Sequence, residues 1–163
     1  SLLKEFLAKG ASATTTDHNL DTPLHHAAHC SFTEVLLEHG ADINATNRQG
    51  HSPLYTACKH NRLDVAKLLL SRGADVNAIV RDEHWLSLMF LVIETYWHDC
   101  GGALSPRLQL ADLLLGHGAD VHAATKDGTT VLHKAVQFID AALVRHLVER
   151  GADVHATTAA GQS

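Results

Sequence analysis

The chain has 163 residues, of which 45% are apolar and 19% are charged, as in a globular protein with one sizeable core. The formal net charge is −5 and no block of Lys or Arg stands out, which argues against nucleic acid or an anionic membrane as the main partner. The longest apolar stretch, residues 85–93, is too short to span a bilayer, and the N-terminus lacks the layout of a signal peptide.

The cysteines indicate the redox environment. Cys30, Cys58 and Cys100 form an odd, widely spaced set without a CxxC pair. We interpret them as free thiols in a reducing compartment. The expected localisation is therefore intracellular, either cytoplasmic or nuclear.

Two short phrases alternate along the chain. The copies of the first are TPLHHAA (22–28), SPLYTAC (52–58) and TVLHKAV (130–136). The copies of the second are LAKGAS (7–12), LEHGADINA (37–45), LSRGADVNA (70–78), LGHGADVHA (115–123) and VERGADVHA (148–156). Gly40 and Gly73 are 33 residues apart, and so are Gly118 and Gly151. A fixed period of this length indicates stacked structural repeats.

The residue types predict two helices in each repeat. The expected N-caps of the first helices are Thr22, Ser52 and Thr130. Pro23 and Pro53 follow at the first helical position, which proline favours. Residues 62–73 have the apolar spacing of an amphipathic second helix that ends at Gly73, and residues 2–10 read as an earlier second helix. One repeat cannot bury its apolar face alone, so neighbouring repeats must stack.

These phrases and their period resemble those of the ankyrin repeat family, over essentially the whole chain. The resemblance implies an all-α solenoid in which each repeat has a β-hairpin finger and two antiparallel helices. It also implies that partners bind to the finger tips and to the concave face formed by the first helices.

In this frame the chain is one domain with four full repeats flanked by partial ones. The expected segments are a partial repeat at 1–16, a shortened repeat at 17–46, repeats at 47–81, 82–124 and 125–157, and the start of another at 158–163. We expect this chain to be a fragment of a longer array of repeats.

Two repeats depart from the pattern. Thr22 and Gly40 are 18 residues apart, against 21 in the regular repeats, and we expect the loss in the second helix. The repeat at 82–124 is long, with an insertion near 94–107. Two alignments stay open for its first helix, with either Ser87 or Trp85 in the place of the N-cap.

The cluster HHAAHC at 25–30 raises the question of a metal or catalytic site. The resemblance gives His25 and His133 a structural role in ordering neighbouring loops. On a continuous first helix, His26 and Cys30 would share a face and could supply two metal ligands. Nothing nearby in the sequence completes the set, so we predict no metal site and no cofactor.

No nucleophile elbow, phosphate-binding loop or pair of catalytic carboxylates is recognisable, so we predict that the chain is not an enzyme. The favoured function is a monomeric module that binds another protein, with no nucleic acid and no membrane insertion. The candidate contacts on the fingers are His18, Asn19, Asp21, Arg48, Gln49, His51, Glu83, His84, Trp85, Lys126, Asp127 and Thr129. Those on the first helices and the insertion are His26, His29, Thr56, Lys59, His60, Lys134, Gln137 and Trp97.

Two alternatives stay open. The array is the targeting or regulatory arm of a larger enzyme (a ubiquitin ligase adaptor, a kinase or an NTPase) or of a channel. Alternatively, it is the substrate of an asparaginyl hydroxylase. Asn44 and Asn77 match the position that such enzymes modify in the family that the chain resembles.

Overall fold

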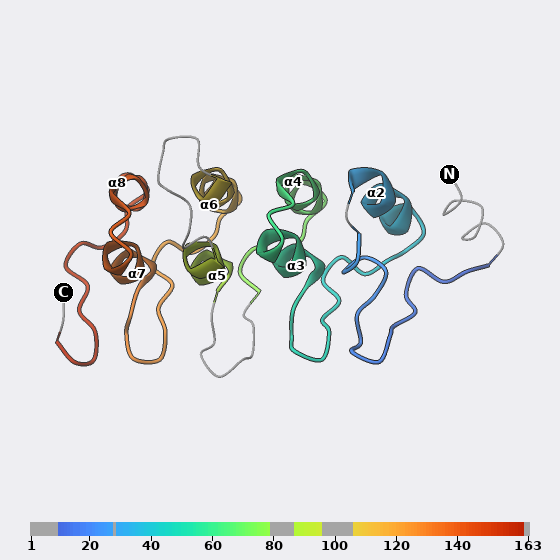
Figure 1. Ribbon diagram of the computed structural model, residues 1–163, viewed down its shortest axis with the longest axis horizontal. Coiled ribbons are helices and arrows are strands. Elements are labelled where there is room, and N and C mark those ends of the chain that lie inside the picture. Colours follow the sequence, from blue (N-terminus) through green and yellow to red (C-terminus); the bar gives the residue numbers. More distant parts are fainter. Residues whose placement is uncertain (1–9, 28, 79–86, 96–105, 162–163) are drawn as a thin grey trace. The chain divides into compact units, whose positions relative to one another are not determined.

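A computed structural model describes residues 10–27, 29–78, 87–95 and 106–161, shown as the coloured ribbon in Figure 1. The chain divides into two compact units, Ser1–Asp75 and Val76–Ser163. Within the described ranges the regular structure is helical, and the isolated β-bridge between Ala124 and Thr130 is the one β pairing recorded. The expected all-α repeat architecture is confirmed.

The first unit contains helices α2 (Cys30–Glu38), α3 (Pro53–Lys59) and α4 (Leu63–Ser71). Helices α3 and α4 pack as a pair, and α2 packs against α4 (Figure 1). Val65 and Leu69 of α4 are both fully buried, because they lie four residues apart on one face. The expected N-cap Ser52 is confirmed, since its hydroxyl accepts the backbone N–H of Tyr55 at 3.1 Å.

The second unit contains helices α5 (Leu88–Thr95), α6 (Pro106–Gly116), α7 (Val131–Gln137) and α8 (Ala141–Glu149). Helix α5 packs with α6, α7 packs with α8, and α5 also contacts α7 (Figure 1). The largest fully buried side chains of this unit are Leu88, Met89, Phe90, Ile93, Leu110, Leu114, Leu143 and Leu147. The core of the unit is therefore mainly aliphatic, as the scarcity of aromatic residues requires.

The short repeat loses its three residues in the first helix, not in the second. Helix α2 has 9 residues, the same length as α4 and α8. Residues 23–26 form only a turn, closed by the N–H of His25 bonding to the carbonyl of Thr22 at 2.9 Å. The prediction of a shortened second helix is wrong, because α2 must present its full buried face to α4. A single turn still buries Leu24, His25 and Ala27.

This change also removes the helical pairs expected in the histidine cluster. His29 has an extended backbone (φ −139°, ψ 146°) and is the N-cap of α2, so it does not lie on a first helix. Cys30 opens α2 and corresponds to Leu63 of α4, both being the first residue of a second helix. His26 and Cys30 therefore do not share a helical face, and the expected two-ligand pair is wrong.

Ser87, not Trp85, takes the N-cap place of the long repeat. The carbonyl of Ser87 accepts the N–H of Leu91 at 3.4 Å, as the carbonyl of Thr130 accepts that of Lys134 at 3.2 Å. This confirms the alignment on Ser87. Residues 96–105, and with them Trp97 of the expected insertion, lie outside the described residues.

Candidate partner-binding surface

In the first unit, the side chain at the start of each described finger holds that finger in shape. In the first finger, Oδ1 of Asp17 accepts the N–H groups of Asn19 (2.8 Å) and Asp21 (3.0 Å). In the next finger, Oδ1 of Asn47 accepts those of Gln49 (3.0 Å) and His51 (2.9 Å) in the same pattern. These bonds satisfy backbone groups that would otherwise need water, so the tips are ordered before any partner arrives.

The third described finger uses hydroxyl groups for the same purpose. The Thr125 hydroxyl donates to one carboxylate oxygen of Asp127, and the Thr129 hydroxyl donates to the other at 2.8 Å. The side-chain hydrogen bonds from Thr125 and Thr129 lower the pKa of the Asp127 carboxyl. The carboxylate of Asp127 is thus a fixed negative charge at this tip.

Hydrogen bonds also join fingers within a unit. In the first unit, the N–H of Arg48 donates to the carbonyl of Asn19 at 2.8 Å, and Nδ2 of Asn47 donates to Oδ1 of Asp21 at 2.8 Å. In the second unit, the N–H of Ala159 donates to the carbonyl of Asp127 at 2.8 Å. Adjacent tips therefore keep a fixed spacing.

His25 has the structural role that the resemblance implies. Its Nδ1 accepts the backbone N–H of Thr22 at 3.1 Å, so Nε2 carries the proton and donates to the carbonyl of His51 at 2.9 Å. The side chain is buried and links the first turn to the next finger. His133 makes the same hydrogen bond within its own repeat, since its Nδ1 accepts the backbone N–H of Thr130 at 3.2 Å.

Several predicted contacts gather in one polar pocket of the first unit, with a volume of about 230 Å³. The predicted residues that line it are Asp21, His26, His51, Thr56, Lys59 and His60. The pocket lies between the first finger and turn on one side and α3 with its finger on the other. Finger and first-helix residues thus form one continuous surface here.

A second pocket, of about 910 Å³, lies in the second unit. The predicted residues that line it are Asp127, Thr129, Lys134 and Gln137. Lys134 also pairs with Glu94 at 3.5 Å, which holds its ammonium group near α5. Val136 and Val154 add exposed apolar surface to this pocket, 58% and 54% exposed respectively.

The other predicted contacts fall outside these pockets. The exposed ones on the fingers are His18, Asn19, Arg48, Gln49 and Lys126. His29 packs edge-on against Phe32 at the start of α2, with ring centroids 6.1 Å apart. Glu83, His84, Trp85 and Trp97 lie outside the described residues.

Arg62 is a pocket residue that the sequence did not indicate. It lines the pocket of the first unit, and its Nη1 donates to the carbonyl of Ala27 in the preceding repeat at 3.1 Å. From sequence, Arg62 reads as the first residue of the expected helix 62–73, and nothing in the pattern indicates a contact with the preceding repeat. This contact exists because the preceding repeat ends its first segment after a single turn.

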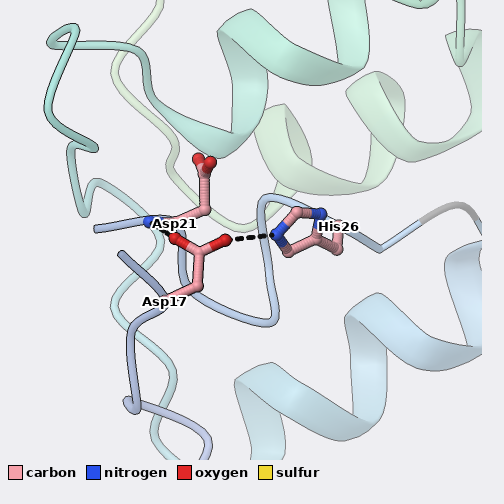
Figure 2. Close-up of side chains that lie close together, drawn as sticks. All are labelled: Asp17, Asp21 and His26. Carbon is pink, nitrogen blue, oxygen red and sulfur yellow. Dashed lines mark hydrogen bonds and ion pairs between the residues drawn. The ribbon is translucent and has the colours of Figure 1, made fainter. Parts of the chain in front are cut away.

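His26 faces the carboxylate of Asp17, and the carboxylate of Asp21 lies nearby but points away from this pair (Figure 2). Nε2 of His26 is 3.4 Å from Oδ2 of Asp17, and Asp21 lies next to both. Desolvation raises the pKa of the Asp17 carboxyl, but hydrogen bonds from the backbone of Asp21 and Asn19 and from His26 outweigh it and lower the pKa. Asp17 therefore stays ionised over the physiological pH range.

The described cysteines are not placed as nucleophiles. Burial raises the pKa of the Cys58 thiol to about 12. Desolvation and the nearby Asp64 carboxylate raise the pKa of Cys30 as well. Because the thiolate is the reactive form, the raised pKa values lower the reactivity of both thiols.

Comparison with known proteins agrees with this architecture. A family model described as ankyrin repeats (3 copies) matches residues 1–79, and one described as ankyrin repeats (many copies) matches residues 102–145. The chain belongs to the ankyrin repeat family. Within the described residues, no helix of this ankyrin repeat chain has the length and apolar character that crossing a membrane requires.

The similar proteins include two plant ubiquitin ligases and a solved ankyrin domain. The chain is 37% identical over 66 residues to the probable E3 ubiquitin-protein ligase XBOS33 of Oryza sativa subsp. japonica, covering 39% of this chain and 13% of that protein. It is 38% identical over 58 residues to the E3 ubiquitin-protein ligase XBAT33 of Arabidopsis thaliana, covering 34% of this chain and 11% of that protein. The ankyrin repeat domain of Bcl-3, a member of the IkappaB protein family, matches 99% of this chain and 69% of its own at 27% identity and a TM-score of 0.83.

Proposed function

We propose that this chain is a non-catalytic module that binds a partner protein through its finger tips and the adjoining first helices. One observation carries the proposal: in each unit, residues from fingers and first helices line a common pocket. We further propose that the chain acts as a monomer inside the cell.

The hydrogen bonding of the fingers supports this proposal. Asp17, Asn47 and Asp127 each fix the tip of their own finger through hydrogen bonds. A surface that is already ordered loses little conformational entropy on binding, which favours affinity. The polar lining of the first-unit pocket favours a partner segment with hydrogen-bonding and charged side chains.

The experiment substitutes residues that line the two pockets and leaves the second helices unchanged. Thr56→Arg with Lys59→Glu alters the first pocket, and Gln137→Arg alters the second. Lys67→Glu, an exposed position of α4 on the second-helix side, is the matched control. Quantitative affinity purification identifies partners, and titration with the purified partner then measures the affinity.

We expect the pocket variants to weaken partner binding at least about tenfold while Lys67→Glu leaves it unchanged. Equal affinity for the wild-type chain and both pocket variants would place the binding surface elsewhere and contradict the proposal. Circular dichroism confirms that each variant keeps its helix content.

A second candidate function is supported by the similarity to two ubiquitin ligases. In this proposal the chain is the targeting arm of a larger ligase and presents the bound partner for ubiquitination. The test compares ubiquitination of the partner in two sets of cells. One set expresses the wild-type full-length protein, and the other expresses its Lys59→Glu variant. Unchanged ubiquitination despite lost binding would argue against this role.

A third candidate is modification of the chain itself by an asparaginyl hydroxylase. Asn44 and Asn77 are both exposed. Oδ1 of Asn44 accepts one N–H, from Asp75 at 2.9 Å, whereas Asn77 accepts from Asp120 and also donates to the carbonyl of Gly118 at 2.9 Å. Asn44 is therefore the better candidate, and mass spectrometry of the hydroxylase-treated chain should show the addition of one oxygen there first.

A further inference from the structure

The turn that replaces the first helix brings three possible metal ligands together. Asp17 and Asp21 lie on the first described finger, and His26 follows at the end of the turn (Figure 2). One ligand atom from each residue lies within 4.8 Å of the other two. We propose that Asp17, Asp21 and His26 bind a divalent transition-metal ion of the zinc class, at the edge of the first-unit pocket.

Each carboxylate keeps one oxygen available for an ion. Oδ1 of Asp17 is used by the backbone of Asn19 and Asp21, so its Oδ2 is the oxygen that faces His26. Oδ1 of Asp21 is used by Nδ2 of Asn47, at 2.8 Å. Hydrogen bonds of this kind orient the ligands of metal sites from the outer shell.

The distances suit an ion of zinc size. With zinc–ligand bonds of about 2.1 Å, ligand atoms of a tetrahedral site lie about 3.4 Å apart. The 3.4 Å separation of the Asp17 and His26 atoms already matches this spacing. The ligand atom of Asp21 already lies within 4.8 Å of the other two. Rotation of the Asp21 side chain can bring it to the tetrahedral spacing of about 3.4 Å. Three protein ligands and water then complete the coordination.

The mixture of ligands selects the class of ion. Calcium and magnesium prefer sites made only of oxygen, whereas imidazole nitrogen favours zinc, copper, nickel and cobalt. The negative charge of two close carboxylates adds attraction for a dication. The sequence pattern pairs His26 with Cys30 and predicts no metal site, whereas the fold brings His26 close to the aspartates of the finger.

The alternative role of the cluster is an ion pair between Asp17 and protonated His26. The other basic groups that line the same pocket as His26 are His25, His51, Lys59, His60 and Arg62. A metal ion takes the place of the proton on the imidazole, so metal binding and the ion pair exclude one another.

The chain has 14 histidines, so a measurement of total metal binding would not identify the site. The experiment therefore locates the ion directly. Sub-stoichiometric Co²⁺ is added to the isotopically labelled chain, and paramagnetic broadening of its amide signals is recorded. We expect the signals of residues 17–27 to broaden before those around His122 and His155. Zn²⁺ affinity is measured in parallel by calorimetry near neutral pH and in mild acid, where it should be weaker.

The variants are chosen to keep the fold. Asp21→Asn retains an oxygen that can accept from Asn47, and His26→Gln changes an exposed side chain. Both should lower Zn²⁺ affinity about tenfold or more. The matched control is His122→Gln, an exposed histidine of another finger, which should leave the affinity unchanged.

Two results would overturn the proposal. One is cobalt broadening spread over many histidines with no preference for residues 17–27. The other is Zn²⁺ binding by Asp21→Asn and His26→Gln as tight as that of the wild-type chain. The amide spectra of the variants report their folding, and the wild-type broadening map decides even if one variant misfolds.

Discussion

Asn61 and Ile139 occupy the same place in two repeats, two residues after a first helix, and both have a left-handed backbone, with φ of 52° and 56°. In both cases the N–H bonds to a carbonyl three residues earlier, Cys58 at 3.0 Å and Val136 at 2.9 Å. Asparagine tolerates this conformation, whereas a β-branched residue is strained in it. Ile139 gains little in return, because its side chain is 89% exposed.

Ile139→Asn should therefore stabilise the chain, by about 1 kcal/mol. The reverse change in the matched repeat, Asn61→Ile, should destabilise it by a similar amount. Urea unfolding followed by circular dichroism measures both free energies. Ile139→Val is the control, because it keeps the β-branch and should leave the free energy of unfolding unchanged. Equal stability of Ile139→Asn and Ile139→Val would contradict the proposed backbone strain.

Gly128 is required by its backbone and by crowding at the finger tip. Its φ is +78°, and an added Cβ would lie 3.3 Å from the backbone N of Ala159. Gly118→Ala is the matched control, since Gly118 has a similar φ of +86° but open space around it. We expect both alanines to cost about 1 kcal/mol of unfolding free energy, and Gly128→Ala to cost more. Equal losses of unfolding free energy in the two variants, measured by urea unfolding, would contradict the prediction. They would show that the backbone of Ala159 moves away from the added Cβ at no cost.

His25 should be far more sensitive to replacement than its neighbour His26. Replacing His25 with Ala leaves the buried N–H of Thr22 without its acceptor, at a cost of about 1–3 kcal/mol, and removes one of the two hydrogen bonds to the carbonyl of His51, which still accepts the N–H of Asn47. His26→Ala removes one exposed ion pair, which solvent screens and which therefore contributes little to stability. Thermal unfolding of both variants in metal-free buffer compares them. Similar losses for the two would contradict the structural role of His25.

Cys58 should make stability depend on alkaline pH. Its pKa rises from 9.0 in the unfolded chain to about 12 in the fold, so the folded state holds the thiol proton more tightly. The contribution is complete below pH 9 and is lost as the pH rises toward 12, with a slope of about 1.4 kcal/mol per pH unit. Urea unfolding of wild type and Cys58→Ala at several alkaline pH values isolates this slope. Parallel profiles for the two proteins would refute it.

The sequence by itself determined the local elements of this protein and its family. The hydroxyls of Ser52 and Thr130 were expected as N-caps, and both accept the expected backbone N–H. Residues 62–73 were expected as a helix, and α4 runs over Leu63–Ser71 with Gly73 following at positive φ. Caps, helix periodicity and C-terminal glycines act within a few residues, so their consequences can be read from sequence.

Only the tertiary structure decided which helix of the short repeat lacks the three residues. Counting residues shows that three are missing between Thr22 and Gly40, and the sequence-based prediction of a loss in the second helix is wrong. Packing of α2 against α4 decided the place of the loss, since the second helix keeps its buried face and the first segment shrinks to a turn. That choice positions His26 beside Asp17 and Asp21, and the chemistry of this cluster depends on side chains brought together by packing rather than on any local pattern.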